Sequence, residues 1–478
     1  MRHVHAFGDD ALGQLDAVGV VEALTSGRVG RAEVVEAAIA RTEAVNPALN
    51  GLAYQAFDRA RAQAEAPPKP GFFSGVPTFV KDNVDVAGLP TMRGTDAWPP
   101  RPAQADSDFA RTYLATGLIP LGKTQLSEYG FSASAEHPRL GSVRNPWNTD
   151  HTAGASSSGS GAFVAAGAVP IAHANDGGGS IRIPASCNGL VGLKPSRGRL
   201  PLDKEVSRMP IRVVANGVLS RSVRDTAAFY REAERVWRAP KLPPIGDVAH
   251  AGAQRLRVAV VTRSLLRECT PEMRELTLKS AGLLEELGHR IDHLEKPPVP
   301  DSFASDFVLY WGLLAMGQIQ QNRHDINGFD VNRLDNLTRG LDRHARRNLH
   351  RIPLALVRLA RARRYTVRLA RSYDLVLTPT LADEPPRIGY LDPTADYQQI
   401  IDRLEEWVAY TPLHNVTGEP AISLPLAMSA NGLPVGMMFS APTGQEARLL
   451  EVAYELEDAR PWARIQDVSR EPVPPASV

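Results

Sequence analysis

Apolar and small residues recur at helical spacing near the start of the chain. Residues 10–65 include VVEALTSGRVGRAEVVEAAIARTEAV, which places small and apolar side chains on one face and Glu or Arg on the other. A period close to 3.6 residues predicts amphipathic helices. The segment APPKPG, residues 66–71, then breaks the pattern as a turn or linker. We therefore expect a helical region at residues 1–70.

Shorter apolar runs follow and predict strands. VPTFV, IPLG and IAHA are separated by helix and turn signals, and residues 156–168 predict a helix built of small residues. Further along, RLRVAVVTRS and YDLVLTPT predict strands, and PEMRELTLKSAGLLEELGH predicts an amphipathic helix that begins at a proline. AISLPLAMSANGLPVGMMFSAP predicts a hairpin around Asn431-Gly432. Strands mixed with helices predict the α/β class.

The composition of the chain limits the binding partners and the cellular compartment that we expect for the protein. The 478 residues are 43% hydrophobic, with 54 Lys and Arg against 53 Asp and Glu, so the formal charge is +1. A nearly neutral chain has no overall field suited to a polyanion, so nucleic acid is not an expected partner. The two cysteines, Cys187 and Cys269, cannot build a disulfide framework, and no zinc-ligand spacing is present, so we expect a cytoplasmic protein.

No membrane partner is expected either. The N-terminus MRHVHAFGDDALGQLDAV lacks the apolar core of a secretory signal, and no run approaches about 18 apolar residues. Residues 339–371 carry eleven arginines and a single acid, Asp342. That stretch fits a membrane-surface or anion-binding helix, or simply a solvated helix face. The neutral total favours the solvated face.

Residues 117–124, GLIPLGKT, match the phosphate-binding loop pattern G-x4-G-K-[ST]. Such a loop must follow a strand and open a helix, so that its backbone N–H groups surround a phosphate. Here a helical pattern precedes Gly117, the interior residues are typical of a strand, and Pro120 removes one donor. A nucleotide-binding function through this loop is therefore the weakest alternative.

Three other stretches make more chemical sense together. Lys81 closes an apolar strand, and the sequence alone leaves open whether it is buried or reaches solvent. GASSSGSG, residues 154–161, gathers hydroxyls on a Gly-rich turn, where a helix cap is the alternative. In NDGGGSIRIPAS, three glycines at 177–179 precede Ser180. Unobstructed N–H groups beside a hydroxyl are what an oxyanion hole for acyl transfer requires.

A serine nucleophile needs a base. A histidine arrangement is the first alternative, but no G-x-S-x-G elbow is present, and His173 lies on the strand that leads to the glycines. We favour Lys81, acting through a second serine. It must then be partly neutral near pH 7, so burial has to lower its pKa by several units from about 10.4.

These residues resemble the amidase signature family of serine hydrolases. The long stretch GASSSGSGAFVAAGAVPIAHANDGGGSIRIPASCNGLVGLKPSRGR is similar to the family signature, as are GVPTFVKDNVDVAGLPTMRGT, LGKTQLSEYG and TPLHNVTGEPAISLP. By position, Lys81 matches the catalytic lysine, Ser156 the cis-serine and Ser180 the nucleophile. The resemblance implies a cis peptide bond between Ala155 and Ser156. It further implies oxyanion donors at Gly177, Gly178 and Gly179, a supporting hydroxyl at Ser157, and a buried pair of Asp176 and Arg182 that braces the loop.

The same resemblance implies the fold and the organisation of the chain. The fold would be α/β, a large mixed twisted sheet covered by helices on both faces. We expect a catalytic core at residues 71–235, a variable substrate-pocket region with helices at 236–400, and a return to the same core at 401–478. All of it would form one catalytic domain.

The stretch HANDGGGSIRIPAS is similar to the branch of the family that contains 6-aminohexanoate cyclic dimer hydrolase. The implied substrate is therefore a small or oligomeric amide, anilide or carbamate. Ala155, Gln125 and Asn175 depart from the usual residues and leave that substrate open. No cofactor or metal is implied, and the chain would be a monomer or homodimer. An amidotransferase-type subunit that acts with a partner is the second alternative. For the pocket we expect these residues: Gln125, Tyr129, Phe131, Trp311 and Trp407.

Overall fold

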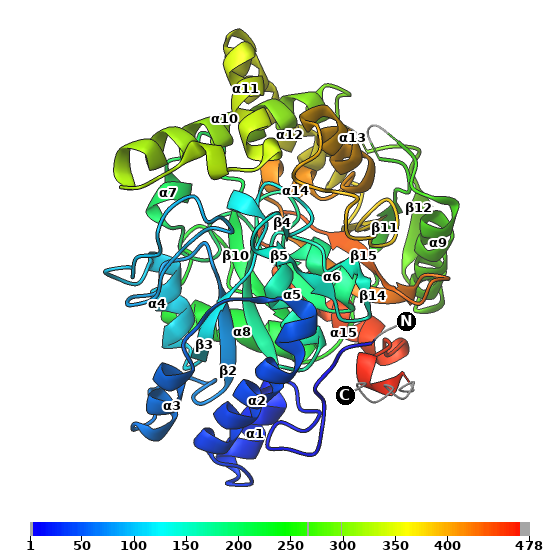
Figure 1. Cartoon of the computed structure of the whole chain (residues 1–478). Coiled ribbons are helices and arrows are strands. Elements are labelled where there is room, and N and C mark those ends of the chain that lie inside the picture. The colour runs from blue at the N-terminus through cyan, green and yellow to red at the C-terminus, as the bar shows by residue number, and fades with distance from the viewer. Residues whose placement is uncertain (1–2, 265–266, 298, 469–478) are drawn as a thin grey trace.

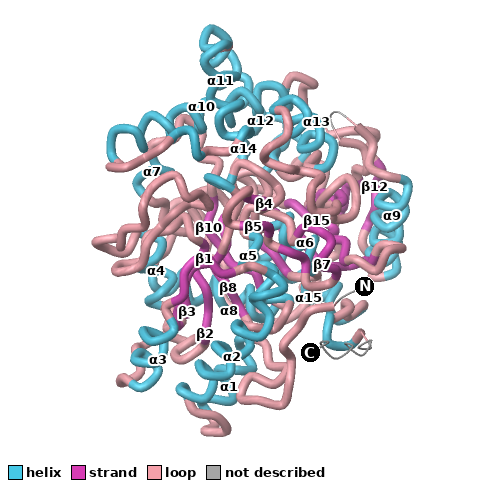
Figure 2. Tube along the Cα trace, in the orientation of Figure 1, coloured by secondary structure: helices cyan, strands magenta, loops and turns pink. Residues whose placement is uncertain are grey.

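A computed structural model of the chain describes residues 3–264, 267–297 and 299–468 (Figures 1 and 2). The segments expected at residues 1–70 and 401–478 therefore each include residues outside the described ranges. The helices are α1 Ala17–Thr25, α2 Arg31–Leu49, α3 Phe57–Glu65, α4 Asp108–Ala115, α5 Ser158–Ala165, α6 Arg182–Asn188, α7 Lys204–Ser207, α8 Val223–Val236, α9 Pro271–Glu286, α10 Phe303–Asp325, α11 Asn336–Arg347, α12 Ile352–Leu369, α13 Tyr397–Trp407, α14 Pro412–Thr417 and α15 Glu446–Ala459. The strands are β1 Leu52–Gln55, β2 Pro77–Lys81, β3 Ile119–Thr124, β4 Glu136–His137, β5 Gly141–Ser142, β6 Arg144–Asn145, β7 Asn148–Thr152, β8 Ile171–Asp176, β9 Val191–Lys194, β10 Ala215–Ser220, β11 Arg257–Val260, β12 Arg290–His293, β13 Leu375–Pro379, β14 Ala421–Met428 and β15 Pro434–Ser440.

A mixed sheet forms the centre of the molecule. Within the described residues it has eight strands in the order β12-β11-β13-β15-β14-β9-β10-β8. The pairs β11–β12 and β11–β13 are parallel, and the remaining pairs are antiparallel. Strands β14 and β15 form the hairpin predicted around Asn431-Gly432. The α/β class is confirmed.

Helices cover this sheet on both faces, as the family resemblance implies. α5 and α6 pack on one face against β8, β9, β14 and β15, whereas α8 and α15 pack on the other (Figure 1). The small residues of α5 let it approach its neighbours closely. A Cβ on Gly159 would stand 2.2 Å from the carbonyl oxygen of Gly51. One hydrophobic cluster runs through these layers and includes residues as far apart as Leu12 and Trp462.

A smaller sheet with the order β1-β3-β2 lies beside the large one. The helical periodicity of residues 10–65 does not predict β1, which interrupts the helices there. The GLIPLGKT motif forms β3, and its Lys123 is fully buried. Lys123 Nζ lies 3.2 Å from Asp82 Oδ1 and donates to the carbonyl oxygen of Pro90. A strand in a packed core cannot surround a phosphate, so the structure contradicts the nucleotide-binding alternative.

Helices α10, α11, α12 and α13 gather at one end of the molecule (Figure 1). α10 packs against α11 and α12. Its inner side carries aromatic residues toward the carboxyl end of β8, where the predicted site residues lie. In the described part of the chain, no helix combines the length and the apolar character needed to cross a bilayer.

Candidate active site

Lys81 ends strand β2 and is completely buried. Its Nζ donates to Ser156 Oγ over 2.7 Å and to Asn175 Oδ1 over 2.6 Å. Burial lowers the pKa of Lys81 to about 7, although the Asp176 carboxylate acts in the opposite direction. An amine with that pKa is neutral for much of the time near pH 7. The question that the sequence leaves open, whether this lysine is buried, is thereby answered.

An amide pair fixes the partner of Lys81. Asn175 Nδ2 donates to Asn83 Oδ1 over 3.0 Å, which turns Asn175 Oδ1 toward the lysine. The acceptor is thus a neutral carbonyl rather than a carboxylate. In the sequence, Asn175 stands out only as a departure from the family pattern, and Asn83 is not predicted as a site residue. The signal available was its position two residues after Lys81.

The serine-rich turn supplies two hydroxyls with different partners. The peptide bond between Ala155 and Ser156 is cis, as the resemblance implies. Ser156 Oγ points to Lys81, whereas Ser157 Oγ donates to the carbonyl oxygen of Ser180 over 2.5 Å. Ser157 therefore holds the backbone of the residue that carries the third hydroxyl. Among the described residues, no hydrogen bond joins Ser156 to Ser180.

The glycine loop leaves a row of donors available. Across the described residues, the backbone N–H groups of Gly177, Gly178, Gly179 and Ser180 find no hydrogen-bond partner in the protein. Gly179 has φ +143°, and a Cβ there would meet Thr411 Oγ1 at 2.4 Å. Only glycine fits that position. The loop can thus turn several N–H groups toward one negatively charged oxygen.

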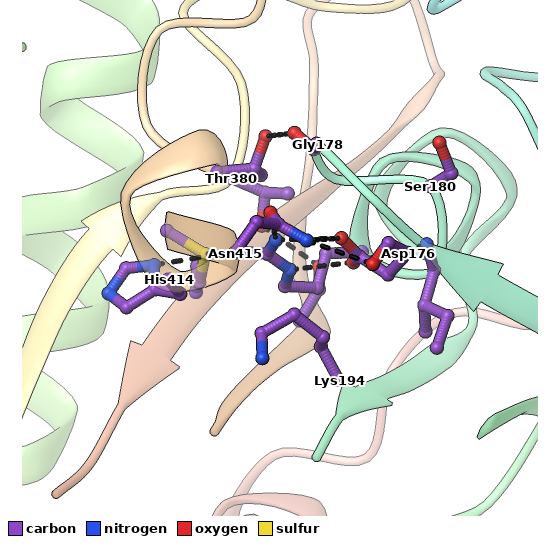
Figure 3. Close-up of polar contacts among 12 residues, drawn as sticks. Asp176, Gly178, Ser180, Lys194, Thr380, His414 and Asn415 are labelled. Carbon is purple, nitrogen blue, oxygen red and sulfur yellow. Dashed lines mark hydrogen bonds and ion pairs between the residues drawn. The ribbon is translucent and has the colours of Figure 1, made fainter. Parts of the chain in front are cut away.

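Buried polar contacts brace this loop from the far side. Asp176 forms an ion pair with Arg182, and both side chains are completely buried. Arg182 is the largest of several groups that hold the pKa of Asp176 at about 2, against the effect of its burial. Asn415 Nδ2 donates to Asp176 Oδ1 over 2.7 Å, and Thr411 Oγ1 donates to the carbonyl oxygen of Gly178 over 2.6 Å. In Figure 3 the Asn415 contacts lie on one side of Asp176, and the Ser180 hydroxyl points away from them.

The family resemblance implies the Asp176–Arg182 pair but assigns no role to Asn415 or Thr411. Both lie at or within α14, more than 200 positions from the loop that they hold. His173, the alternative base, is fully buried, and burial lowers its pKa to about 3. It accepts from the backbone N–H of Lys81 and contacts no hydroxyl of the site. Among the residues that the structure describes, no histidine is hydrogen-bonded to Ser180 as a base would be.

A pocket of about 100 Å³ opens beside Ser180. Its walls are mostly apolar or aromatic. Within the described part of the chain, Glu405 is the one ionisable side chain that lines it. The lining residues are Gly130, Phe131, Ser132, Ala133, Ala155, Gly178, Ser180, Ile183, Phe307, Val308, Trp311, Ile401, Leu404, Glu405, Val408 and Pro412. Trp311 Nε1 donates to the carbonyl oxygen of Phe131 over 3.1 Å, and its ring stacks on Phe307.

Of the five residues expected in the pocket, Phe131 and Trp311 line it. Tyr129 lies behind Phe131, where its hydroxyl accepts from Asn322. Gln125 donates its backbone N–H to Gly51. Trp407 instead lines a separate, polar pocket of about 630 Å³. These three residues are not among those that line the pocket beside Ser180, so their part in substrate binding stays a prediction.

Comparison with known proteins decides the family. The Amidase family description matches residues 33–450. This chain belongs to the amidase signature family. It is 71% identical over 467 residues to the putative amidase AmiC of Mycobacterium leprae (strain TN), a match that covers 98% of this chain and 99% of the relative. It is 33% identical over 474 residues to the 6-aminohexanoate-cyclic-dimer hydrolase of Paenarthrobacter ureafaciens, covering 94% and 95% of the two chains.

Solved structures of amidase signature enzymes share the fold. The structure of 6-aminohexanoate cyclic dimer hydrolase complexed with substrate superposes with a TM-score of 0.86 at 30% identity, covering 96% of this chain and 100% of the other. A bacterial aryl acylamidase of the same family gives a TM-score of 0.84 at 26% identity, covering 95% and 98%. The chain is thus an amide hydrolase that acts on carbon-nitrogen bonds.

Proposed function

We propose that this amidase cleaves small, largely uncharged amides through an acyl-enzyme on Ser180, with Ser156 and Lys81 as the proton relay. The observation that carries the proposal is the 2.7 Å hydrogen bond between buried Lys81 and Ser156. An amine whose pKa is about 7 can accept a proton near neutral pH. The four unpaired N–H groups beside Ser180 support its role as the nucleophile.

The chemistry proceeds in two halves. Neutral Lys81 accepts the proton of Ser156, Ser156 accepts that of Ser180, and Ser180 Oγ attacks the amide carbon. Ser156 and Ser180 are not hydrogen-bonded in this structure. Bound substrate therefore has to bring their two hydroxyls within hydrogen-bond distance. The loop N–H groups stabilise the oxyanion while the relay returns a proton to the leaving nitrogen. Water then attacks the acyl-enzyme and releases the acid.

The pocket beside Ser180 supports an uncharged acyl or aryl group in the substrate. Aliphatic amides, cyclic amides, anilides and carbamates fit this description, and the expected monomer or homodimer in the cytoplasm remains part of the proposal. A relative at 33% identity is named for a cyclic dimer substrate. That name makes cyclic amides one arm of the substrate screen.

The test combines a substrate screen with trapping of the intermediate. The purified chain alone is expected to hydrolyse at least one uncharged amide, anilide or carbamate, and mass spectrometry is expected to find the acyl group on Ser180. Ser180→Ala should abolish both signals. Ser158→Ala is the matched control, because the buried Ser158 hydroxyl has no hydrogen-bond partner within the described residues. An acyl group on another residue, or turnover only with a partner subunit, would contradict the proposal.

A further inference from the structure

The arginine-rich segment forms an exposed surface that the proposed catalytic site does not use. Ten of the eleven arginines at residues 339–371 are exposed, and Arg339 is half-buried. Two of the ten form ion pairs, Arg346 with Asp342 and Arg358 with Asp306. Over the described part of the chain, the other eight form no ion pair: Arg343, Arg347, Arg351, Arg361, Arg363, Arg364, Arg368 and Arg371. We call the exposed side chains of residues 343–371 the cationic face.

Large apolar side chains are exposed on the same face. Leu349 and Leu354 are 52% and 53% exposed, and Val357 and Val367 are each 45% exposed. Elsewhere in the described residues, the exposed large apolar side chains are Tyr54, Val236 and Leu278, which lie on other elements. Exposed apolar residues that cluster beside cations indicate an interaction surface rather than a solvated helix face.

The outward side of α12 has an ordered pattern. Leu354, Val357, Arg361, Arg364 and Arg368 follow one another at steps of three and four residues. That spacing places them in one stripe along the helix. The stripe is aliphatic at one end and cationic at the other. The opposite side, with Ala355, Leu359, Ala362 and Thr366, is buried against the protein.

The charge of the molecule is strongly uneven as a consequence. The segment contributes a net charge of +10, and because the whole chain carries +1, all other residues together carry −9. The neutral total hides this separation. Eight unpaired guanidinium groups at one end of the molecule create a positive field that attracts a negatively charged partner. Guanidinium groups bind phosphate and carboxylate oxygens through two parallel hydrogen bonds.

The apolar residues select among anionic partners. Single-stranded nucleic acids are held by cations together with exposed aromatic rings, and Tyr365, the aromatic residue of α12, is half-buried. A symmetric contact between two copies would set arginine against arginine. Leucine and valine between guanidinium groups instead fit a bilayer surface, where phosphates bind the cations and acyl chains receive the aliphatic side chains.

We propose that the cationic face is a docking surface for anionic lipid bilayers. It departs from the expectation of no membrane partner, in which the nearly neutral total charge favoured a solvated helix face over a membrane-surface helix for this segment. α12 would lie on the bilayer without crossing it. α10 packs beneath this face and carries Phe307 and Trp311, which line the pocket beside Ser180. Docking would therefore hold the apolar pocket near a source of apolar amides.

Vesicle flotation of the full chain tests the proposal without any use of its activity. We expect binding to phosphatidylserine-rich vesicles, little binding to pure phosphatidylcholine vesicles, and weakening as ionic strength rises. The triple variant Arg361→Glu, Arg364→Glu, Arg368→Glu should lose about 100-fold in affinity, since each basic residue contributes about five-fold near an anionic surface. Leu354→Ser with Val357→Ser should weaken the binding that remains at high salt.

A matched control changes the same total charge elsewhere. Arg28→Glu, Arg238→Glu and Arg290→Glu replace three exposed arginines outside the segment and should retain most of the binding. Equal loss in both triple variants would overturn the proposal, as would equal binding to neutral vesicles. Oligonucleotide binding that competes with vesicles, and that Leu354→Ser with Val357→Ser leaves unchanged, would identify a nucleic-acid surface instead. All substituted residues are exposed, and circular dichroism confirms that each variant is folded.

Discussion

Lys81 and Lys123 are two buried lysines on neighbouring strands with opposite surroundings. Both are completely buried, and burial lowers the pKa of each. Lys123 faces the Asp82 carboxylate, whereas Lys81 faces a hydroxyl and an amide carbonyl. A carboxylate keeps an ammonium charged, and neutral acceptors allow it to lose its proton. The partner of a buried lysine, rather than its burial, therefore separates an ion pair from a candidate base.

The largest effect is expected from removal of the Lys81 amine. Lys81→Met should lower kcat by about 10⁴-fold or more, because residues of a catalytic relay act as a unit. Lys194→Met is the control, since Lys194 is also fully buried with a pKa of about 7 but donates to the carbonyl oxygen of Pro195 and to no hydroxyl. Steady-state kinetics on one amide compares the two. Similar losses in both variants would show that any buried amine matters only for folding.

The next effect concerns stability. Asp82→Asn leaves the Lys123 ammonium buried without its counter-charge, so the free energy of unfolding should fall by about 3 kcal/mol. Urea denaturation measures this loss. The kcat of the folded fraction should change little, since Asp82 contacts Lys123 and the Met92 backbone but not the serines. A large fall in kcat with an unchanged free energy of unfolding would show that Lys123 contributes to catalysis.

Asn175→Asp gives Lys81 the kind of partner that Lys123 has. In the parent, kcat/KM should rise with pH through about 7, since the neutral amine is the active form. The new carboxylate raises the pKa of Lys81, so activity at pH 7 should fall about tenfold for each pH unit by which the profile moves. Most of it should return at alkaline pH. A uniform loss at every pH would mean that Asn175 only positions the lysine.

The smallest effect is expected at the brace of the glycine loop. Thr411→Val removes the hydroxyl that holds the carbonyl oxygen of Gly178 and retains the size of the side chain. One net hydrogen bond contributes about 1 kcal/mol, so kcat should fall about five-fold while KM changes little. A change in KM alone would place Thr411 in ground-state binding of the substrate.

The sequence predicts local features of the site better than distant ones. The hydroxyl turn and the glycine loop are contiguous, so Ser180 could be picked out from the residues themselves, whereas Ser156 and Arg182 are named through the family resemblance. Burial of Lys81 could not be decided, because it depends on the packing of β2 beside β8. Asn415 is even less accessible to sequence reasoning, since it meets Asp176 across 239 positions.

The lining of the substrate pocket is predicted least well. Phe131 and Trp311 line the pocket beside Ser180, whereas Trp407 lines another one. Apolar periodicity identifies a helix and its buried face without saying which neighbour that face meets. The arginine-rich segment illustrates a related limit, which concerns charge. Charge counted over a whole chain cannot reveal that one end holds nearly all of the positive excess.

The tie between Thr411 and the glycine loop also bears on when the enzyme becomes competent during its synthesis. The serines and the lysine leave the ribosome within the first half of the chain, but the residue that secures Gly178 is made more than 200 positions later. A nascent or truncated chain that ends before residue 411 carries every reactive group without that support. The glycine loop is thus fully braced only once synthesis has passed residue 411.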